Sequence, residues 1–136
     1  MRKSRAKGED RLTDGFARSV LHVTDVETSV HFYVDCLGFT TAWCHEEEGK
    51  LIVAQVDRNG CALILASNLS EKAGNGTMFI SLSPQPWSKE AQASALDALR
   101  AEFTGKGAEV KDGEWGYRGV MVADPDGNTL MFNYSD

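Results

Sequence analysis

Cysteine and proline are scarce in this sequence of 136 residues, which contains three of each. The cysteines form no CxxC pair and have no metal-type spacing, which argues against a disulfide framework or a cysteine metal site. Each lies among apolar residues, so we expect buried, reduced thiols at Cys36, Cys44 and Cys61. No apolar run reaches the roughly 18 residues of a membrane-spanning helix, and no apolar signal segment follows the charged start. The sequence therefore predicts a cytoplasmic protein without a membrane partner.

Basic residues are in the minority, with 14 Lys and Arg against 20 Asp and Glu and a net charge of −6. Five of the 14 basic residues fall within residues 1–14, with no aromatic residue among them. We expect this segment to be a disordered, solvated basic tail. The remaining chain is strongly acidic, which disfavours nucleic acid and anionic membranes as partners and favours cationic small molecules over long range.

One sequence pattern occurs twice. The frame Asp-x-x-Gly-x-x-Leu, followed by two apolar residues, begins at Asp57 and again at Asp124. In the second copy, Asp-Pro-Asp-Gly supplies a carboxylate that can cap a turn, a proline with φ preset, and a glycine free to take positive φ. Apolar residues flank both copies, which predicts two hairpins. Because an internal repeat decides architecture, the chain is predicted to be one folding unit built twice.

The first unit begins with a strand and a helix. Residues 16–23 alternate strictly, with Arg18, Val20 and His22 on one face of the expected strand. Thr24 is expected to be the N-cap of a capping box over residues 24–27, and Gly38 is placed to end the helix. Three further strands are expected over residues 39–44, 51–56 and 61–66.

The second unit follows a polar connector, residues 68–76. After a strand over residues 77–83, Ser88 is expected to cap a helix with an apolar stripe that includes Leu96 and Phe103. Trp87, beside a proline just before this helix, is expected to pack in the core. Strands over residues 108–110, 119–123 and 129–134 complete the unit.

The predicted fold class is α+β. Two tandem βαβββ modules, residues 15–67 and 77–136, form a single domain in which a cupped, barrel-like mixed sheet has its helices outside.

Two segments carry a resemblance to a known family: VTDVETSVHFYVDCLGF (residues 23–39) and WGYRGVMVADPDGNTLMF (residues 115–132). They resemble the vicinal oxygen chelate (VOC) superfamily, the fold of glyoxalases, bleomycin-resistance proteins and extradiol dioxygenases, with the bleomycin-resistance branch nearest. The resemblance implies a VOC domain over residues 15–136. It does not fix the activity, because this fold hosts isomerases, dioxygenases, thiol transferases and drug-sequestering proteins.

Metal-using relatives hold a divalent ion with His, Gln or Glu side chains from the first and last strands of each module. Carried over to this sequence, the four positions are Arg18, Ile64, Met131 and Met78, with Thr77 as the register alternative to Met78. None of these side chains holds a hard or borderline cation. We therefore expect that the usual metal site is absent and that no cofactor is needed.

What remains is an apolar and aromatic cavity with few polar groups. Trp115 lies between glycines in a loop, where an apolar ring is expected to cover something, and the matching segment borders the ligand groove in the bleomycin-resistance branch. The candidate ligand-binding residues are Arg18, His22, Trp43, Ile64, Met78, Phe79, Trp115, Tyr117 and Met131.

Three hypotheses on function follow. The leading one is a protein that binds a small aromatic or amphipathic organic molecule without bond-making, as drug-sequestering relatives do. The resemblance also implies a homodimer. The second is a VOC-fold enzyme of the lyase, isomerase or dioxygenase type, with a displaced metal or with His22 as base and Arg18 as its partner for an oxyanion or carboxylate. The third is an interaction module without a small ligand, which predicts a filled cavity.

Overall fold

The computed structural model describes residues 13–112 and 119–134, so the predicted basic tail lies outside the described residues except for its last two positions. The elements in chain order are β1 (Ser19–His22), α1 (Val26–His31), the π-helical turn η2 (Phe32–Cys36), β2 (Thr40–Glu47), β3 (Lys50–Arg58), β4 (Cys61–Ala66), the 3₁₀ turn η3 (Ser70–Lys72), β5 (Thr77–Ser81), α2 (Lys89–Gly105), β6 (Val110–Asp112), β7 (Val120–Ala123) and β8 (Thr129–Asn133).

The strands form two four-stranded sheets with the same topology. The first has the order β1-β4-β3-β2 and the second the order β5-β8-β7-β6. In each sheet the first strand of the module pairs in parallel with the last, and the other pairs are antiparallel. This repetition confirms the α+β fold of two βαβββ modules. The sheets do not close into one barrel.

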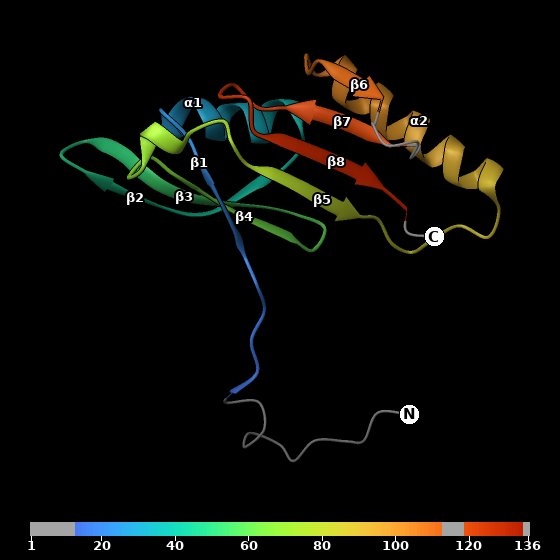
Figure 1. Cartoon of the computed structure of the whole chain (residues 1–136), viewed down its shortest axis with the longest axis horizontal. Coiled ribbons are helices and arrows are strands. Elements are labelled where there is room, and N and C mark those ends of the chain that lie inside the picture. The colour runs from blue at the N-terminus through green and yellow to red at the C-terminus, as the bar shows by residue number, and fades with distance from the viewer. Residues whose placement is uncertain (1–12, 113–118, 135–136) are drawn as a thin grey trace.

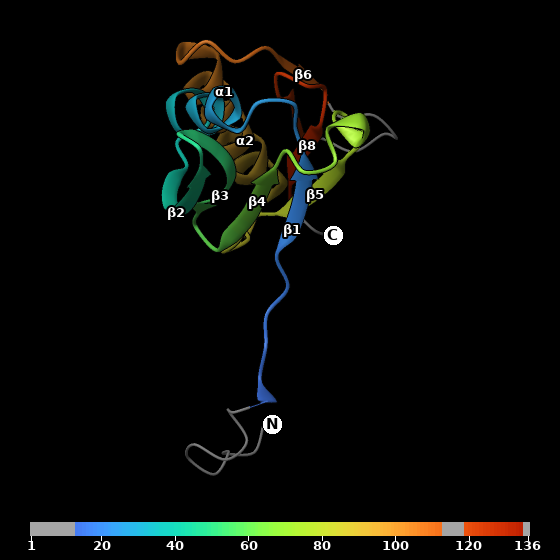
Figure 2. The ribbon, with the colours of Figure 1, turned by 90° about the vertical axis from the view of Figure 1, so that its left-hand side faces the viewer.

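The hydrophobic core joins the two modules. Helix α1 contacts β3 and β4, and helix α2 contacts β6 and β7. Figure 2 shows the two helices together on one side of β1, β5 and β8. One cluster of buried residues includes Leu21 and Tyr33 from the first module and Phe103 and Phe132 from the second. The helices and one face of each sheet therefore enclose a shared core, which leaves the other face of each sheet free of helices.

The start of α1 differs from the predicted capping box. Asp25 has an extended backbone and is the N-cap, and its side chain accepts a hydrogen bond from the Glu27 backbone N–H. Thr24, the predicted cap, instead donates its hydroxyl to Asp126 of the second module at 2.8 Å. The prediction was wrong because a contact between distant segments takes the hydroxyl that a local motif would have used.

The turn of the last hairpin is held by the buried carboxylate of Asp124, as predicted for the repeated motif. Its Oδ1 accepts from the backbone N–H groups of Asp126 and Asn128, both at 2.9 Å. Its Oδ2 accepts from Asn128 Nδ2 and from the hydroxyl of Tyr33, both at 3.0 Å. Because Tyr33 lies on η2 of the first module, this turn also joins the modules.

Asn128 extends the same junction. Its side-chain nitrogen donates to the His22 carbonyl at 2.9 Å, and its side-chain oxygen accepts from the Gly76 backbone N–H at 2.8 Å. A side chain added at Gly74, where φ is +86°, would meet the backbone of Asp126. The connector and the end of β1 are therefore both fixed against this turn.

A second link between the modules is an ion pair. Arg58 on β3 donates to both carboxylate oxygens of Glu102 on α2, at 2.8 and 3.2 Å, and to the Leu37 carbonyl at 2.9 Å. Its guanidinium lies 5.4 Å from the centre of the Phe103 ring. Gly38 ends the helical segment with φ of +74°, as predicted, and a side chain there would displace Arg58.

Other local expectations were wrong. Trp87 is fully exposed rather than packed in the core, and Cys44 is exposed on β2, whereas Cys36 and Cys61 are half-buried. Strand β2 extends to Glu47, beyond the predicted end at residue 44, because the acidic segment continues the pairing with β3. Within residues 13–112 and 119–134, no helix is long and apolar enough to cross a membrane.

We expect Tyr33→Phe to lower the free energy of unfolding by about 1.5–3 kcal/mol, because it removes a buried hydrogen bond to a carboxylate. Burial raises the pKa of the Tyr33 hydroxyl well above its ordinary value, and the Asp124 charge raises it further, so the bond is present at neutral pH. Urea unfolding measures the change. The control is Tyr134→Phe at a half-buried tyrosine; equal losses in both variants would contradict the assignment.

We expect Glu102→Gln to lower stability at pH 7 by about 1 kcal/mol, since the ion pair is partly exposed. The hydrogen bond from Arg58 lowers the pKa of Glu102 below its ordinary value of 4.5. The stabilisation is therefore present above pH 4.5 and is lost as the pH falls through the lower folded-state pKa. The stability difference from wild type should shrink in acid, measured by thermal unfolding with exposed Glu46→Gln as control; a pH-independent difference would refute this.

Candidate functional site

The helix-free face of the first sheet carries a row of side chains that crosses all four strands. The strand registers align the row as Val20 on β1, Ile64 on β4, Gln55 on β3 and Trp43 on β2. Val20 and Trp43 remain 48% and 41% exposed, although both are large apolar side chains. The neighbouring residues of these strands point to the opposite face, where Leu21 and Leu65 belong to the core.

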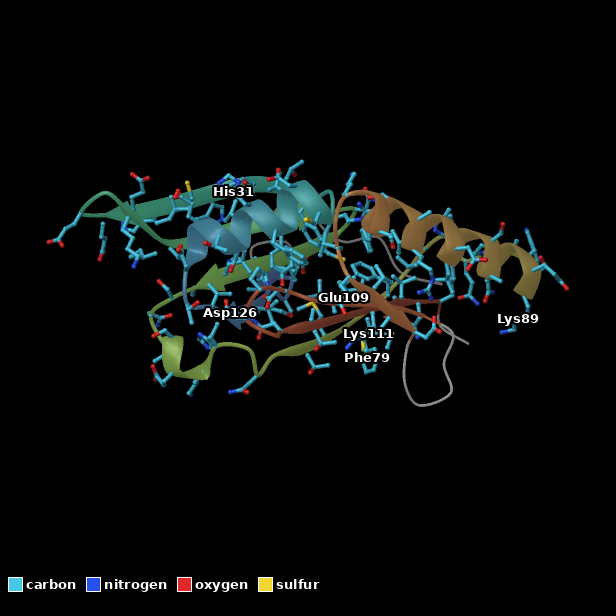
Figure 3. The ribbon with its side chains drawn as sticks, turned by 90° about the horizontal axis from the view of Figure 1, so that it is seen from above. His31, Phe79, Lys89, Glu109, Lys111 and Asp126 are labelled. Atoms are coloured by element: carbon cyan, nitrogen blue, oxygen red, sulfur yellow. The ribbon has the colours of Figure 1, made fainter. Side chains whose placement is uncertain are left out.

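The second sheet carries the corresponding row. Its members are Phe79 on β5, Met131 on β8, Met121 on β7 and Lys111 on β6. Phe79 is 50% exposed, whereas Met131 is buried. Figure 3 shows Phe79 and Lys111 on the side of the second sheet that faces away from α2. The repeat thus places an aromatic or apolar side chain at equivalent positions in both modules.

The register decides which predicted positions share this face. Ile64 and Met131 occupy equivalent places, each between the first and third strands of its sheet, as the repeat predicts. Met78 was expected beside them, but it pairs with the buried Leu130 and packs against the core. The prediction for Met78 was therefore wrong by one residue, and Thr77 and Phe79 are the β5 residues on the helix-free side.

A polar network lies at the centre of the first sheet's open face. The side-chain oxygen of Gln55 accepts from the Arg18 guanidinium and from the indole nitrogen of Trp43, both at 2.9 Å. Its side-chain nitrogen donates to Asp57 at 2.9 Å. Gln55 is only 8% exposed, so these bonds satisfy a buried amide and fix its orientation. Arg18 and Trp43, both predicted site residues, are brought together by a residue that the sequence did not single out.

His22 lies on the same face of β1, two residues beyond Val20. Its Nδ1 atom is buried and has no hydrogen-bond partner among the described residues. Arg18 is bonded to Gln55 and not to this imidazole. The sequence predicted that His22 acts as a base and that Arg18 binds an oxyanion or carboxylate beside it. The two residues share a face, but no hydrogen bond joins them among the described residues.

A shallow cavity of about 290 Å³ lies on the second sheet. Its walls combine the apolar Met121 with two charged side chains, Glu109 and Lys111. These charges stand at the edge strand, so they can meet a polar substituent while the methionine contacts an apolar ring. The remaining lining residues are Val122, Ala123, Asp124 and Thr129.

Several site residues were not predicted from the sequence, and two predicted site residues lie outside the described part of the chain. The sequence analysis did not predict Gln55, Met121 or Lys111. Strand alternation indicates which residues of one strand share a face, but it does not give the cross-strand register that aligns these three with their neighbours. Trp115 and Tyr117 lie outside the described residues. Across residues 13–112 and 119–134, no three His, Cys, Asp or Glu side chains gather in a group that could hold a metal ion.

The fold and these faces define a class of protein. It is an α+β protein of two modules, and each of its two sheets has one partly apolar face that no helix covers. The chain belongs to the Glyoxalase/Bleomycin resistance protein/Dioxygenase superfamily, because the sequence profile of that family matches residues 15–132. A comparison with curated proteins found no match.

Several solved structures share the fold. TnmS3, an antibiotic binding protein from Streptomyces sp. CB03234, matches with a TM-score of 0.66 and 22% identity, over 91% of this chain and 98% of that chain. The bleomycin-binding protein of Streptomyces verticillus, solved with copper(II)-bleomycin, gives 0.64 and 23%, over 91% and 99%. TioX from Micromonospora sp. ML1 gives 0.63 and 20%, over 88% and 98%. At these identities the likeness shows the fold alone.

Proposed function

We propose that this protein binds a small, flat or amphipathic organic molecule on the helix-free faces of its sheets and holds it without making or breaking bonds. The observation that carries the proposal is the pair of equivalent cross-strand rows. Each contains a large apolar or aromatic side chain that stays about half exposed, Trp43 and Val20 in the first row and Phe79 in the second. A soluble protein seldom leaves such side chains aligned on one face unless they meet a partner.

The chemistry of the rows suits a flat apolar ligand. The indole of Trp43 offers a ring face for stacking, and its nitrogen is already bonded to Gln55, so its orientation is fixed before binding. The thioether of Met121 is flexible and polarisable and adapts to rings of different shape. Affinity would come from stacking and from displaced water, with few polar contacts to set the orientation.

Two of the solved structures that share the fold support this proposal. One is an antibiotic binding protein and the other a bleomycin-binding protein. Both share this chain's fold at low identity, so the extension of ligand binding to this chain is part of the proposal. A drug-sequestering role is the corresponding physiological hypothesis.

The same faces support a homodimer as the binding form. On one chain, both open faces present apolar side chains to solvent, and a second copy would cover them and share the groove. Residues 13–17 run outward from β1, away from the rest of the described chain, with Phe16 79% exposed (Figures 1 and 2). An extended segment of this kind is suited to contact with a partner chain.

We expect Trp43→Ala to weaken binding of naphthalene-2-carboxamide, a neutral two-ring probe, by about tenfold, because it removes a stacking surface. Isothermal titration calorimetry measures the dissociation constant. Trp87→Ala is the matched control, since Trp87 is fully exposed in the segment before α2. Absence of binding to the wild type, or equal losses in the two variants, would reject the proposal for flat aromatic ligands.

For the dimer, we expect light scattering after size exclusion to give twice the chain mass of 14.9 kDa. Val20→Asp should shift the protein to the monomer, because it places a charge where a partner would desolvate it. Ala101→Asp, on the exposed side of α2, should leave the dimer intact. A monomeric wild type would rule out the shared groove.

A further inference from the structure

Arg18 supplies the positive charge of the polar network around Gln55, and the structure holds it in place. Its guanidinium donates to Gln55 at 2.9 Å and lies 5.6 Å from the centre of the Phe16 ring. Gln55 is fixed in orientation, because Trp43 donates to the same oxygen and Asp57 accepts from its nitrogen. A guanidinium carries five N–H donors, and the bond to Gln55 uses one of them.

The position of Arg18 relative to Trp43 determines which part of a bound ligand the other N–H groups of the guanidinium can contact. Both side chains bond to the same oxygen atom of Gln55, so a ring stacked on the indole has its edge close to the guanidinium. Planar guanidinium groups pair with carboxylate-type oxygens through two parallel hydrogen bonds.

We propose that Arg18 is a specificity-determining residue of this site and selects flat aromatic ligands that carry a carboxylate on the ring edge. The inference rests on the proposed function and adds the chemical class of the ligand. It differs from the expectation set by the acidic chain as a whole, which favours cations.

The overall charge of the chain and the charge of Arg18 act over different distances. The acidic excess is distributed over the chain that follows residue 14, and its field is screened beyond about 8 Å at physiological salt. Arg18 acts at hydrogen-bond distance. The nearest acid in the network is Asp57, whose carboxylate already accepts from the Gln55 amide, so it is separated from Arg18 by that side chain. The local positive charge should therefore decide the preference for the bound group.

The test compares three probes that share one ring system: 2-naphthoate, naphthalene-2-carboxamide and 2-naphthylmethylammonium, titrated calorimetrically at 0.15 M salt. The wild type should bind the carboxylate about tenfold more tightly than the carboxamide, and the ammonium more weakly than either. In Arg18→Gln the ratio of carboxylate to carboxamide affinity should fall to about one. Lys72→Gln removes the same charge at an exposed position in η3 and should keep the wild-type ratio.

The outcomes separate this inference from the function on which it rests. Equal binding of carboxylate and carboxamide by the wild type, or an unchanged ratio in Arg18→Gln, would overturn the role of Arg18 and leave aromatic binding in place. A ratio that falls equally in Lys72→Gln would assign the preference to overall charge and would also overturn it. If none of the three probes binds, both proposals fail. Arg18 is exposed, so its replacement should not disturb folding, and circular dichroism checks this.

Discussion

The buried carboxylate of Asp124 is the contact on which the arrangement of the two modules depends. It accepts four hydrogen bonds, three from its own turn and one from Tyr33 of the other module. A carboxylate that is 5% exposed is costly to bury unless such donors surround it. The same turn bonds Thr24 and the His22 carbonyl, so the ends of β1 and α1 are positioned by residues about 100 places away in sequence. Together with the shared core and the Arg58–Glu102 ion pair, this junction fixes the orientation of the two sheets.

That junction has a consequence for the open faces. The modules meet through their helices, their turns and one face of each sheet, so strand alternation directs every second side chain away from the core. The repeat then produces two equivalent rows, but their chemistry has diverged. Gln55 and Trp43 of the first row correspond to Met121 and Lys111 of the second. The first face is therefore ordered by hydrogen bonds, whereas the second combines flexible methionines with charges at its edge.

This fold hosts several chemistries, and the side chains on its open faces decide which of them a given chain can support. The strand positions on the open faces hold Ile64 and Met131, which cannot ligate a hard cation. The polar groups on the first open face are instead Arg18, which directly precedes β1, and Gln55 on β3, which holds it.

The sequence by itself determined the repeated βαβββ order, the Asp124 turn, the helix ends at Gly38 and Ser88, and the residues of β1 that share a face. These follow from local patterns: alternation, helical spacing, caps and turn residues. The tertiary structure alone decided that Thr24 bonds Asp126, that Met78 faces the core and Phe79 does not, and that Gln55 links Arg18 to Trp43. Each of these depends on cross-strand register or on contacts between distant segments, and a shift of one residue reverses the face of a side chain without altering the local pattern.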